Sequence, residues 1–408
     1  MSKEKRSVPK LRFPGFTEDW EQCKLTSFTQ RVKGNDGRMD LPTLTISASE
    51  GWLNQKDRFS ANIAGSEQKN YTLLRQGELS YNHGNSKLAK YGVVYVLKDY
   101  KEALVPRVYH SFKVDESYDA LFVEYYFSTK RPDRELAKLV SSGARMDGLL
   151  NIGYDEFTNI SISVPTFSEQ RQIVALLRRF DKFITLHQRK LEHLILKKKS
   201  LLQKLFPKNG ERYPELRFPG FTDAWEQRKL DSLGKIITGN TPSTLKKEYW
   251  SPNSDGVVWI TPTDINSVKT QCSERLLTKE GASQARIVPA NSILVTCIAS
   301  IGKNTINTVE AAFNQQINAL VPHFSNSYFI LTMLNNMESA FKRVAGTSAT
   351  SIINKKEFGQ LSALLPEIEE QNKIGRIFEL IDDNITLHQR KLEHLQLQKK
   401  ALLQQMFV

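Results

Sequence analysis

The most regular pattern of apolar and polar positions lies in two stretches of about 40 residues, 166–206 and 367–408. In each stretch apolar side chains return at alternating steps of four and three residues, which predicts a long helix with one apolar seam. A seam of this kind is typical of two helices that pair as a coiled coil. A helix of this length would be roughly 60 Å long. The seam residues are Ile173, Leu177, Phe180, Ile184, Leu191, Leu194 and Leu201 in the first stretch, and Ile374, Phe378, Ile381, Ile385, Leu392, Leu395 and Leu402 in the second.

Four polar residues interrupt this seam at matching places, namely His187 and Lys198 in the first stretch and His388 and Lys399 in the second. Buried polar residues at seam positions specify the alignment of paired helices at some cost in stability. We therefore expect these four residues to set the register. A metal site is disfavoured, because His187 and His193 are six residues apart and do not share a helix face.

The ends of the first helix carry start and stop signals. Thr166-Phe167-Ser168-Glu169 has the spacing of a capping box, and Pro207 with Asn209-Gly210 follows the last seam residue. The second helix starts with Glu367, Glu369 and Glu370, where the helix dipole favours negative charge.

Two pairs of segments, one of them inside the long helices, are nearly identical in sequence. Residues 9–25 and 214–230 are identical at 13 of 17 positions, and residues 184–206 and 385–407 at 18 of 23. The centres of the two halves, about 40–150 and 245–345, show no comparable identity. The chain is therefore predicted to hold two similar units whose centres have diverged.

The segments between the long helices mix short strand-like runs with turn signals and short helical runs. Strands are predicted at 92–97, 257–260 and 293–298, and helices at 121–127 and 328–334. The predicted fold is α+β, with two globular domains, each followed by a long helix, and the two helices paired antiparallel. An antiparallel pair would place the globular domains at opposite ends of the rod. The expected boundaries are 1–165, 166–206, 207–213, 214–366 and 367–408.

Polar loops adjoin several predicted strands. Asn, Ser, Thr and Lys in such loops can read base edges or hold phosphates, although the same residue types dominate ordinary turns. For a single loop the turn explanation is favoured, whereas the set of loops in a duplicated protein favours recognition. The candidate DNA-binding residues are Asn82, Asn85, Ser86, Lys87, Lys90, Arg145, Asn240, Thr241, Ser243, Lys246, Lys247, Thr261, Thr263, Lys303 and Asn304.

The composition supports an anionic partner, because the 408 residues have a formal net charge of +13. Most of the excess lies on the first helix, where residues 169–206 carry a net +7, while residues 367–408 carry −1. Two explanations remain open for the basic run Lys197-Lys198-Lys199. It could face DNA phosphates, or it could pair with acidic groups such as Glu379, Asp382 and Asp383.

Other classes of protein are disfavoured. Three cysteines without metal-ligand spacing indicate a reducing, cytoplasmic location, and no apolar run is long enough for a membrane span. The sequence contains no P-loop, no GxGxxG fingerprint, no HExxH and no GxSxG. We therefore expect no catalytic residue and no metal site in this chain.

Several motifs, taken in order along the chain, resemble those of a known protein family. Two LRFPGF motifs, each leading to W-E-x-x-K-L, span Leu11–Leu25 and Leu216–Leu230. Two P-x-x-x-E-Q-x-x-I motifs start at Pro165 and Pro366, and ITLHQRKLEHL follows each. WITPTDI at 259–265 and FNQQINAL at 313–320 complete the set. In this order the motifs resemble the DNA-specificity subunit of type I restriction–modification systems.

The resemblance implies a division of labour. Each globular domain would read one half of a split, asymmetric site in double-stranded DNA, and the helix pair would set the unread spacer and dock two copies of the modification (methyltransferase) subunit. Restriction (translocase and endonuclease) subunits would join that complex. S-adenosylmethionine, ATP and Mg would bind to these partners, and no cofactor to this chain. The alternative is a stand-alone methyltransferase or nuclease, and the missing motifs count against it.

Overall fold

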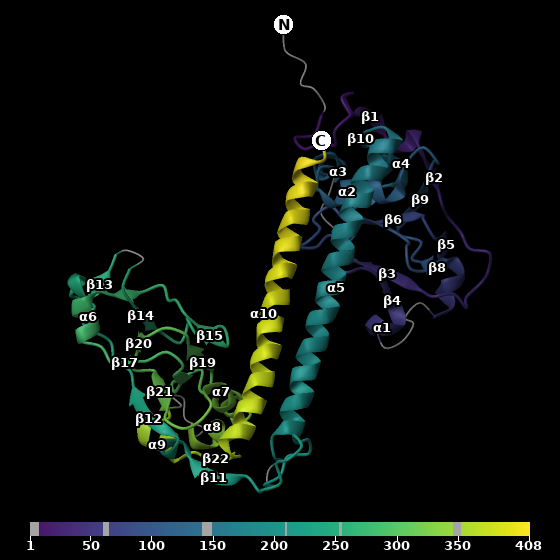
Figure 1. The fold of residues 1–408 in the computed structure, drawn as a ribbon. Helices are drawn as coiled ribbons and strands as arrows, with labels where there is room; N and C mark the ends of the chain where they lie inside the picture. Colours follow the sequence, from purple (N-terminus) through teal and green to yellow (C-terminus); the bar gives the residue numbers. More distant parts are fainter. Residues whose placement is uncertain (1–7, 60–64, 141–148, 209, 253–254, 346–351) are drawn as a thin grey trace. The chain divides into compact units, whose positions relative to one another are not determined.

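The computed structural model describes residues 8–59, 65–140, 149–208, 210–252, 255–345 and 352–408. The chain divides into two compact units (Figure 1). The first comprises Met1–Leu186 with Leu392–Val408, and the second comprises His187–Lys391. Each of the two long helices, α5 (Phe167–Leu205) and α10 (Ile368–Gln405), therefore contributes one part to each unit. None of the helices in the described ranges is long and apolar enough to cross a membrane.

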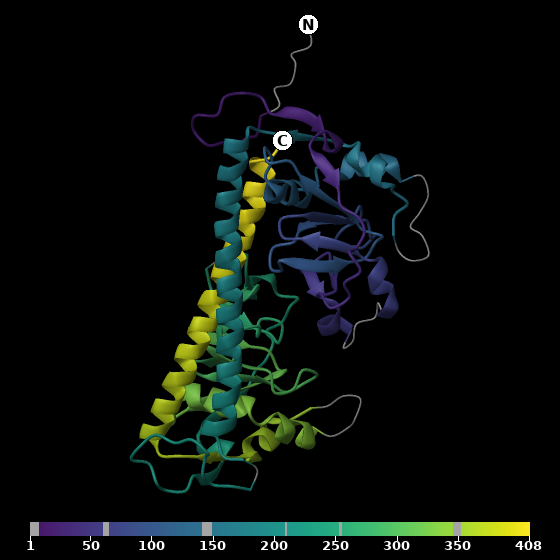
Figure 2. The same ribbon diagram turned by 90° about the vertical axis from the view of Figure 1, so that its right-hand side faces the viewer.

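The predicted helix pair is confirmed, and the pairing is antiparallel. In the second unit His187 of α5 meets His388 of α10, and Lys198, further along α5, meets Asp382, which lies earlier in α10. Figure 2 shows the two helices running side by side in opposite directions. All fourteen predicted seam residues are buried or half-buried, as expected for an interface in which apolar surface leaves water.

The first unit is built from a four-stranded sheet of order β2-β9-β6-β7 and three two-stranded sheets, β1-β10, β3-β4 and β5-β8. Its helices are α1 (Gln55–Phe59), α2 (Ala120–Ser128), α3 (Asp133–Leu139) and α4 (Tyr154–Thr158). The strands are β1 (Glu21–Lys24), β2 (Thr29–Arg31), β3 (Leu44–Ser47), β4 (Gly51–Asn54), β5 (Thr72–Arg75), β6 (Leu79–Asn82), β7 (Val93–Val96), β8 (Glu102–Val105), β9 (His110–Val114) and β10 (Ser161–Val164).

Helix α2 fills the centre of the first unit. Its almost continuous apolar sequence, ALFVEYYFS, has buried residues on all sides, because one side meets the four-stranded sheet and the other meets α5. Tyr81 and Phe112 come from the sheet, and Ile173 and Leu177 come from α5. The core therefore joins the first globular part to the beginning of its own helix.

The second unit contains two five-stranded sheets, of order β12-β21-β18-β19-β15 and β13-β16-β14-β20-β17, and the pair β11-β22. Its shorter helices are α6 (Lys279–Ser283), α7 (Ser327–Asn335), α8 (Glu338–Ala345) and α9 (Lys355–Gln360). The strands are β11 (Glu226–Lys229), β12 (Gly234–Thr238), β13 (Trp250–Ser251), β14 (Val257–Ile260), β15 (Lys269–Thr270), β16 (Leu276–Leu277), β17 (Ile287–Val288), β18 (Ile293–Thr296), β19 (Asn304–Asn307), β20 (Ala311–Phe313), β21 (Ile317–Pro322) and β22 (Ser362–Leu365).

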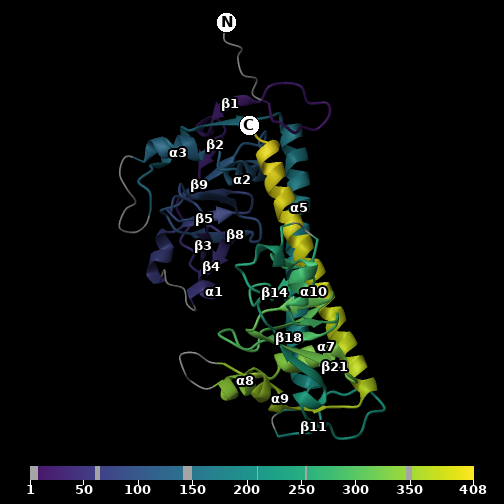
Figure 3. The same ribbon diagram turned by 90° about the vertical axis from the view of Figure 1, so that its left-hand side faces the viewer.

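Helix α7 has the same place in the second unit as α2 in the first. It packs between the first five-stranded sheet and α10 (Figure 3), with Phe329 in a core that also holds Ile293 of the sheet and Phe378 of α10. The strands predicted at 92–97, 257–260 and 293–298 are β7, β14 and β18, and the helices predicted at 121–127 and 328–334 are α2 and α7. These predictions are confirmed, and with them the α+β fold.

A buried ion pair ties each LRFPGF motif to the first turn of a long helix. Arg12 donates to both carboxylate oxygens of Glu169 at 2.8 Å, and Arg217 donates to those of Glu370 at 2.9 and 2.8 Å. The two glutamates are buried, and bidentate pairing is the geometry that best compensates their desolvation. Glu169 thus binds the motif arginine rather than closing the predicted capping box at Thr166.

The neighbouring glutamine fixes the central helix of each unit. Gln170 accepts a hydrogen bond from the backbone N–H of Asp119, the N-cap residue of α2, at 2.9 Å. Gln371 accepts one from Asn326, the N-cap residue of α7, at 3.2 Å. The repeated Glu-Gln dipeptide therefore has one structural task in both units: it holds the motif and the central helix against the long helix.

The C-terminal end of each long helix completes a core. Phe206 stacks on Phe329 and meets Trp225 edge-on in the second unit. Phe407 meets Trp20 edge-on in the first unit. The pattern is equivalent in both units, because Trp20 and Trp225 come from the same repeated motif.

Candidate nucleic-acid interface

The loop after β6 places four predicted DNA contacts around one hollow in the first unit. This hollow has a volume of about 450 Å³ and is also lined by the β3–β4 hairpin and α1. The predicted residues on it are Asn82, Asn85, Ser86 and Lys87, and the structure adds Ser47, Ser49 and Arg58. Sequence reasoning missed the added residues because the hairpin meets the β6 loop through tertiary contacts, such as Asn82 with Ile46, that are not local in sequence.

These loop residues differ in whether their polar groups are already hydrogen-bonded within the protein. Asn82 donates to the carbonyl of Ile46 at 3.2 Å and accepts from the N–H of Gly84 at 3.1 Å, which makes it a residue that holds the loop. The hydroxyl of Ser86 accepts from the N–H of Ala89 at 3.1 Å, as in an ordinary turn.

Asn85 and Lys87 are exposed, and so is Lys90, whose ammonium lies 5.4 Å from the Tyr91 ring. These three remain predicted contacts with DNA. Arg145 lies outside the described residues.

A buried histidine anchors the same loop from behind. The ring nitrogens of His83 lie 2.6 Å from the carbonyl oxygen of Leu150 and 2.8 Å from that of Val108. Its ring stacks on His110 at 4.8 Å, and burial lowers the pKa of His110 to about 4. The loop is therefore held by a rigid, water-poor support, which suits a recognition surface that must keep its shape.

In the second unit the loop after β12 is held by its own asparagine. The side chain of Asn240 donates to the carbonyl of Gln284 and accepts from the N–H of Arg286, both at 2.7 Å. Asn240 is thus a structural residue of this loop, and its predicted contact with a base is not favoured. Thr241 is exposed and donates to Gln315 at 2.6 Å.

The exposed end of this loop is basic. Ser243, Lys246 and Lys247 are exposed, and they remain predicted contacts. The ammonium of Lys246 donates to the hydroxyl of Tyr249 at 3.1 Å, and this hydrogen bond raises the pKa of Lys246. Because Lys246 is exposed, its ammonium can also reach a phosphate.

Two further predicted loops of the second unit are neighbours. Thr261 donates to the carboxylate of Asp264 at 2.6 Å and contacts the hydroxyl of Thr263 at 2.7 Å, which is turn chemistry. Lys303 reaches the carbonyl of Pro262 at 3.5 Å, so the 261–264 and 302–304 loops meet. Asn304 donates to the carbonyl of Gly302 at 3.1 Å and holds its own loop.

In the second unit too, a basic side chain was missed by the sequence reasoning. The guanidinium of Arg275 stacks over Trp250 at 3.6 Å and lies 5.1 Å from the Trp259 ring. Stacking on tryptophan holds an exposed arginine in one orientation. In the sequence, Trp250, Trp259 and Arg275 are spread over 26 residues, so no local pattern indicated that they meet.

The polar seam residues pair across the two helices, as a role in setting the register requires. In the second unit Asp382 of α10 accepts from Lys198 of α5 at 2.6 Å and from Tyr328 of α7 at 2.7 Å. In the first unit Asp181 of α5 accepts from Lys399 of α10 and, at 2.5 Å, from Tyr125 of α2.

The same contact of one aspartate with a lysine and a tyrosine is thus present in both units, and we call it the aspartate lock. The pairing explanation for the lysine run is thereby supported at Lys198. Glu379 and Asp383 instead bind Lys269 of β15.

The histidine pair makes the helix contact sensitive to pH. The Nδ1 atoms of His187 and His388 lie 2.7 Å apart, so one must carry a proton and the other must not. Burial, His187, Lys391 and Lys190 lower the pKa of His388. Because the unfolded chain then binds this proton more readily, the free energy of unfolding should fall as the pH drops below the ordinary value of about 6.5.

Thermal unfolding of the full chain between pH 7.5 and 5.5 measures this effect. The double variant His187→Asn, His388→Asn keeps a polar pair that does not titrate, so it should lose less stability over that interval than the original chain. Equal losses in the two proteins would show that the histidine pair does not contribute.

The fold and the repeated contacts define a class of protein, a duplicated α+β protein. The contacts that recur in both units are the Arg–Glu ion pair, the glutamine contact and the aspartate contact with lysine and tyrosine, and we call them the frame. This frame carries two different sets of sheets and loops. Residues 222–397 match the family described as "Type I restriction modification DNA specificity domain". A crystal structure of a type I restriction–modification S subunit from M. genitalium has the same fold, with a TM-score of 0.66 at 15% identity, over 98% of this chain and 99% of that one.

Curated relatives agree with this match. The chain is 31% identical over 223 residues to the EcoR124I/EcoR124II specificity subunit of Escherichia coli, which is 52% of each chain. It is 31% identical over 180 residues to the HindI specificity subunit of Haemophilus influenzae, 41% of this chain and 39% of that one. The matched part spans about half the length of these relatives. The resemblance of the motifs is confirmed by the match of residues 222–397 to the specificity domain and by relatives that are type I restriction–modification specificity subunits.

Proposed function

We propose that this chain selects the DNA sequence for a type I restriction–modification complex and has no catalytic activity of its own. The observation that carries the proposal is that one frame supports two different recognition parts. The motif ion pair, the glutamine contact and the aspartate lock are equivalent in both units. The sheets between them differ in strand number and order. Two different recognition parts on one repeated frame suit a DNA site with two unlike halves.

The proposed contacts with DNA come from the exposed polar loops. In the first unit they are Asn85, Lys87 and Lys90, together with the serines of the β3–β4 hairpin. In the second they are Lys246, Lys247 and Arg275. Lysines would hold phosphates and set the position of the protein, while serine, asparagine and arginine can hydrogen-bond base edges in the major groove.

The proposed protein partners are two modification subunits, with restriction subunits joining the complex. Support comes from apolar side chains that stay exposed at equivalent positions of the two helices, Leu186 with Leu387 and Leu196 with Leu397. Exposed apolar residues that recur in a repeat indicate a partner that binds twice. S-adenosylmethionine, ATP and Mg would be bound by these partners.

Co-expression with the modification subunit of the same system tests the proposal. Long-read sequencing of the host DNA should show adenine methylation at a bipartite motif with a fixed gap. A continuous motif, or no motif, would contradict it. Methylation or cleavage by the purified chain alone, given DNA, S-adenosylmethionine and Mg, would favour the enzyme alternative.

A domain exchange gives the sharper prediction. Replacing residues 214–365 with those of a relative should change one half of the methylated motif and leave the other half and the gap unchanged, because the frame contacts at Arg217 and Glu370 can be kept. The reciprocal exchange of residues 26–163 is the control and should change only the other half. A change in both halves after one exchange would refute independent reading.

A further inference from the structure

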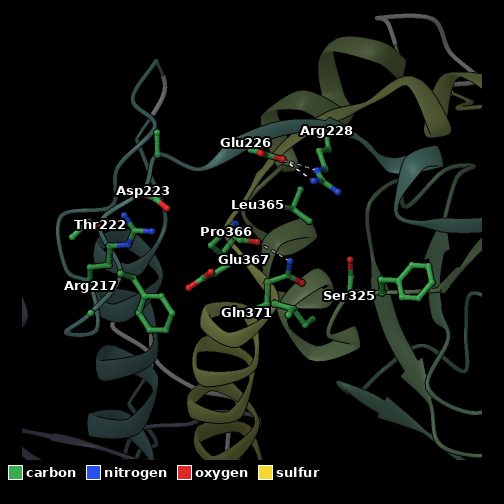
Figure 4. Close-up of a pocket in the computed structure, with 15 residues that line it drawn as sticks. Arg217, Thr222, Asp223, Glu226, Arg228, Ser325, Leu365, Pro366, Glu367 and Gln371 are labelled. Carbon is green, nitrogen blue, oxygen red and sulfur yellow. Dashed lines mark hydrogen bonds and ion pairs between the residues drawn. The ribbon is translucent and has the colours of Figure 1, made fainter.

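The second unit has a hollow at the start of α10, away from the loops proposed to contact DNA, and its lining includes acidic and exposed apolar side chains. It has a volume of about 370 Å³. Figure 4 shows how the LRFPGF motif, the β11–β22 pair and the first turn of α10 surround it. We call it the acidic hollow. Its lining includes Phe221, Asp223, Phe324, Glu367 and Ile368.

Part of the lining of the acidic hollow is apolar surface left in water. Phe324 is 90% exposed and Ile368 is 39% exposed, although both lie beside a large core that could have covered them. Phe221, also in the lining, is half-buried. Adjacent exposed apolar side chains in a concave site are typical of a surface that a partner covers.

The rim has a negative excess. Both cations of the lining are neutralised, since Arg217 binds Glu370 and Arg228 binds Glu226. Beside the hollow, the ammonium of Lys373 lies 4.6 Å from the Phe221 ring. No described residue forms an ion pair with Asp223 or Glu367. Such a rim would repel a DNA phosphate and attract a cationic side chain. The charge therefore favours a protein segment over nucleic acid as the occupant.

The same frame is present in the first unit. Gly15 and Gly220 both have positive φ angles, of +94° and +93°, so the LRFPGF motif turns in the same way. Phe167, the counterpart of Ile368, is 41% exposed. The acidic position is kept as well, because Glu18 corresponds to Asp223. The turn of the motif, an exposed apolar residue at the helix start and one acidic position are thus repeated in the first unit, while Phe324 of the hollow belongs to the divergent centre.

We propose that the acidic hollow and its counterpart in the first unit each dock one copy of the same partner subunit, through a segment with a lysine or arginine next to a large apolar side chain. The inference rests on the proposed function, because it assigns a surface to the partner that binds twice. The apolar side chain would cover Ile368 or Phe167, and the cation would pair with Asp223 or Glu18. The two sites differ at Phe324, which lies two residues before the N-cap of α7, as Ser117 does before that of α2. They also differ at Glu367, where the first unit has Thr166. The second unit should therefore bind more tightly.

The test uses the full chain co-expressed with the modification subunit, with native mass spectrometry to count copies and a titration to measure affinity. The double variant Ile368→Ser, Asp223→Asn should weaken one of the two copies at least tenfold. The matched control is Val309→Ser, because Val309 is 38% exposed in the same unit but lies outside the hollow. It should leave both affinities within twofold.

Two further variants keep the result interpretable. Phe324→Ser changes a side chain that is almost wholly in water, so it should not alter folding and should weaken the same copy at least threefold. Phe167→Ser should weaken the other copy. If all of these variants keep two copies with affinities within twofold, the inference is wrong. It is equally wrong if they weaken DNA binding by the chain alone and leave the partner unaffected.

The proposed function and this inference can fail separately. A methylation map without a bipartite motif would refute the proposed function even if the variants weaken docking. A normal map with unchanged docking in the variants would refute only the acidic hollow.

Discussion

Replacing Glu370 with alanine should lower the free energy of unfolding of the full chain by about 3–5 kcal/mol. Glu370 is fully buried, and both of its oxygens accept hydrogen bonds from Arg217. Removing one partner of a buried pair leaves the other charge desolvated and unpaired, which costs much more than the pair contributes. Chemical denaturation followed by circular dichroism measures the change.

The matched control is the neighbouring residue Glu369, which is exposed in the same helical turn. Glu369→Ala should change stability by less than about 1 kcal/mol, since only its interaction with the helix dipole is lost. The double variant Arg217→Met, Glu370→Met should recover most of the loss, because an apolar pair leaves no buried charge. A Glu370→Ala protein as stable as the Glu369→Ala protein would show that the pair does not hold the frame.

Replacing Phe206 with alanine should cost a similar amount, about 3–5 kcal/mol. This side chain is buried at the end of α5, where it stacks on Phe329 and meets Trp225 and Phe378. Its removal leaves a cavity between α5, α7 and α10 that a rigid core cannot close.

Phe324 provides the control for Phe206, because it is the same residue type in the same unit but is 90% exposed. Phe324→Ala should change the free energy of unfolding by no more than about 0.5 kcal/mol. Equal effects of the two alanine variants in thermal unfolding would show that the helix end is not part of the core.

Much of the fold could be predicted because its signals are local. The seam of α5 and α10 repeats every few residues, and the strands β14 and β18 are apolar runs bounded by turn residues. The nearly identical segments and the dissimilar centres of the two halves together predicted two equivalent units from the sequence alone.

The candidate site was predicted less well, because the state of a polar side chain depends on residues far away in sequence. Asn82 and Asn240 were chosen as residues able to read bases, yet their amides bind Ile46 and the segment at Gln284 and Arg286. Arg275 was overlooked, because only folding brings it onto Trp250. A loop sequence shows which groups are present, and the surrounding packing decides which of them remain available.

The sequence by itself determined the duplication, the two long helices, the α+β class and the resemblance to specificity subunits, because periodicity and repeated motifs are properties of the chain alone. Only the tertiary structure decided what the repeated residues do. Glu169 and Glu370 bind motif arginines, and Asp181 and Asp382 each join a lysine of the opposite helix to a tyrosine. The physical reason is that a charge can be buried only where its partner is brought to it, and the partners here come from segments that no local pattern connects.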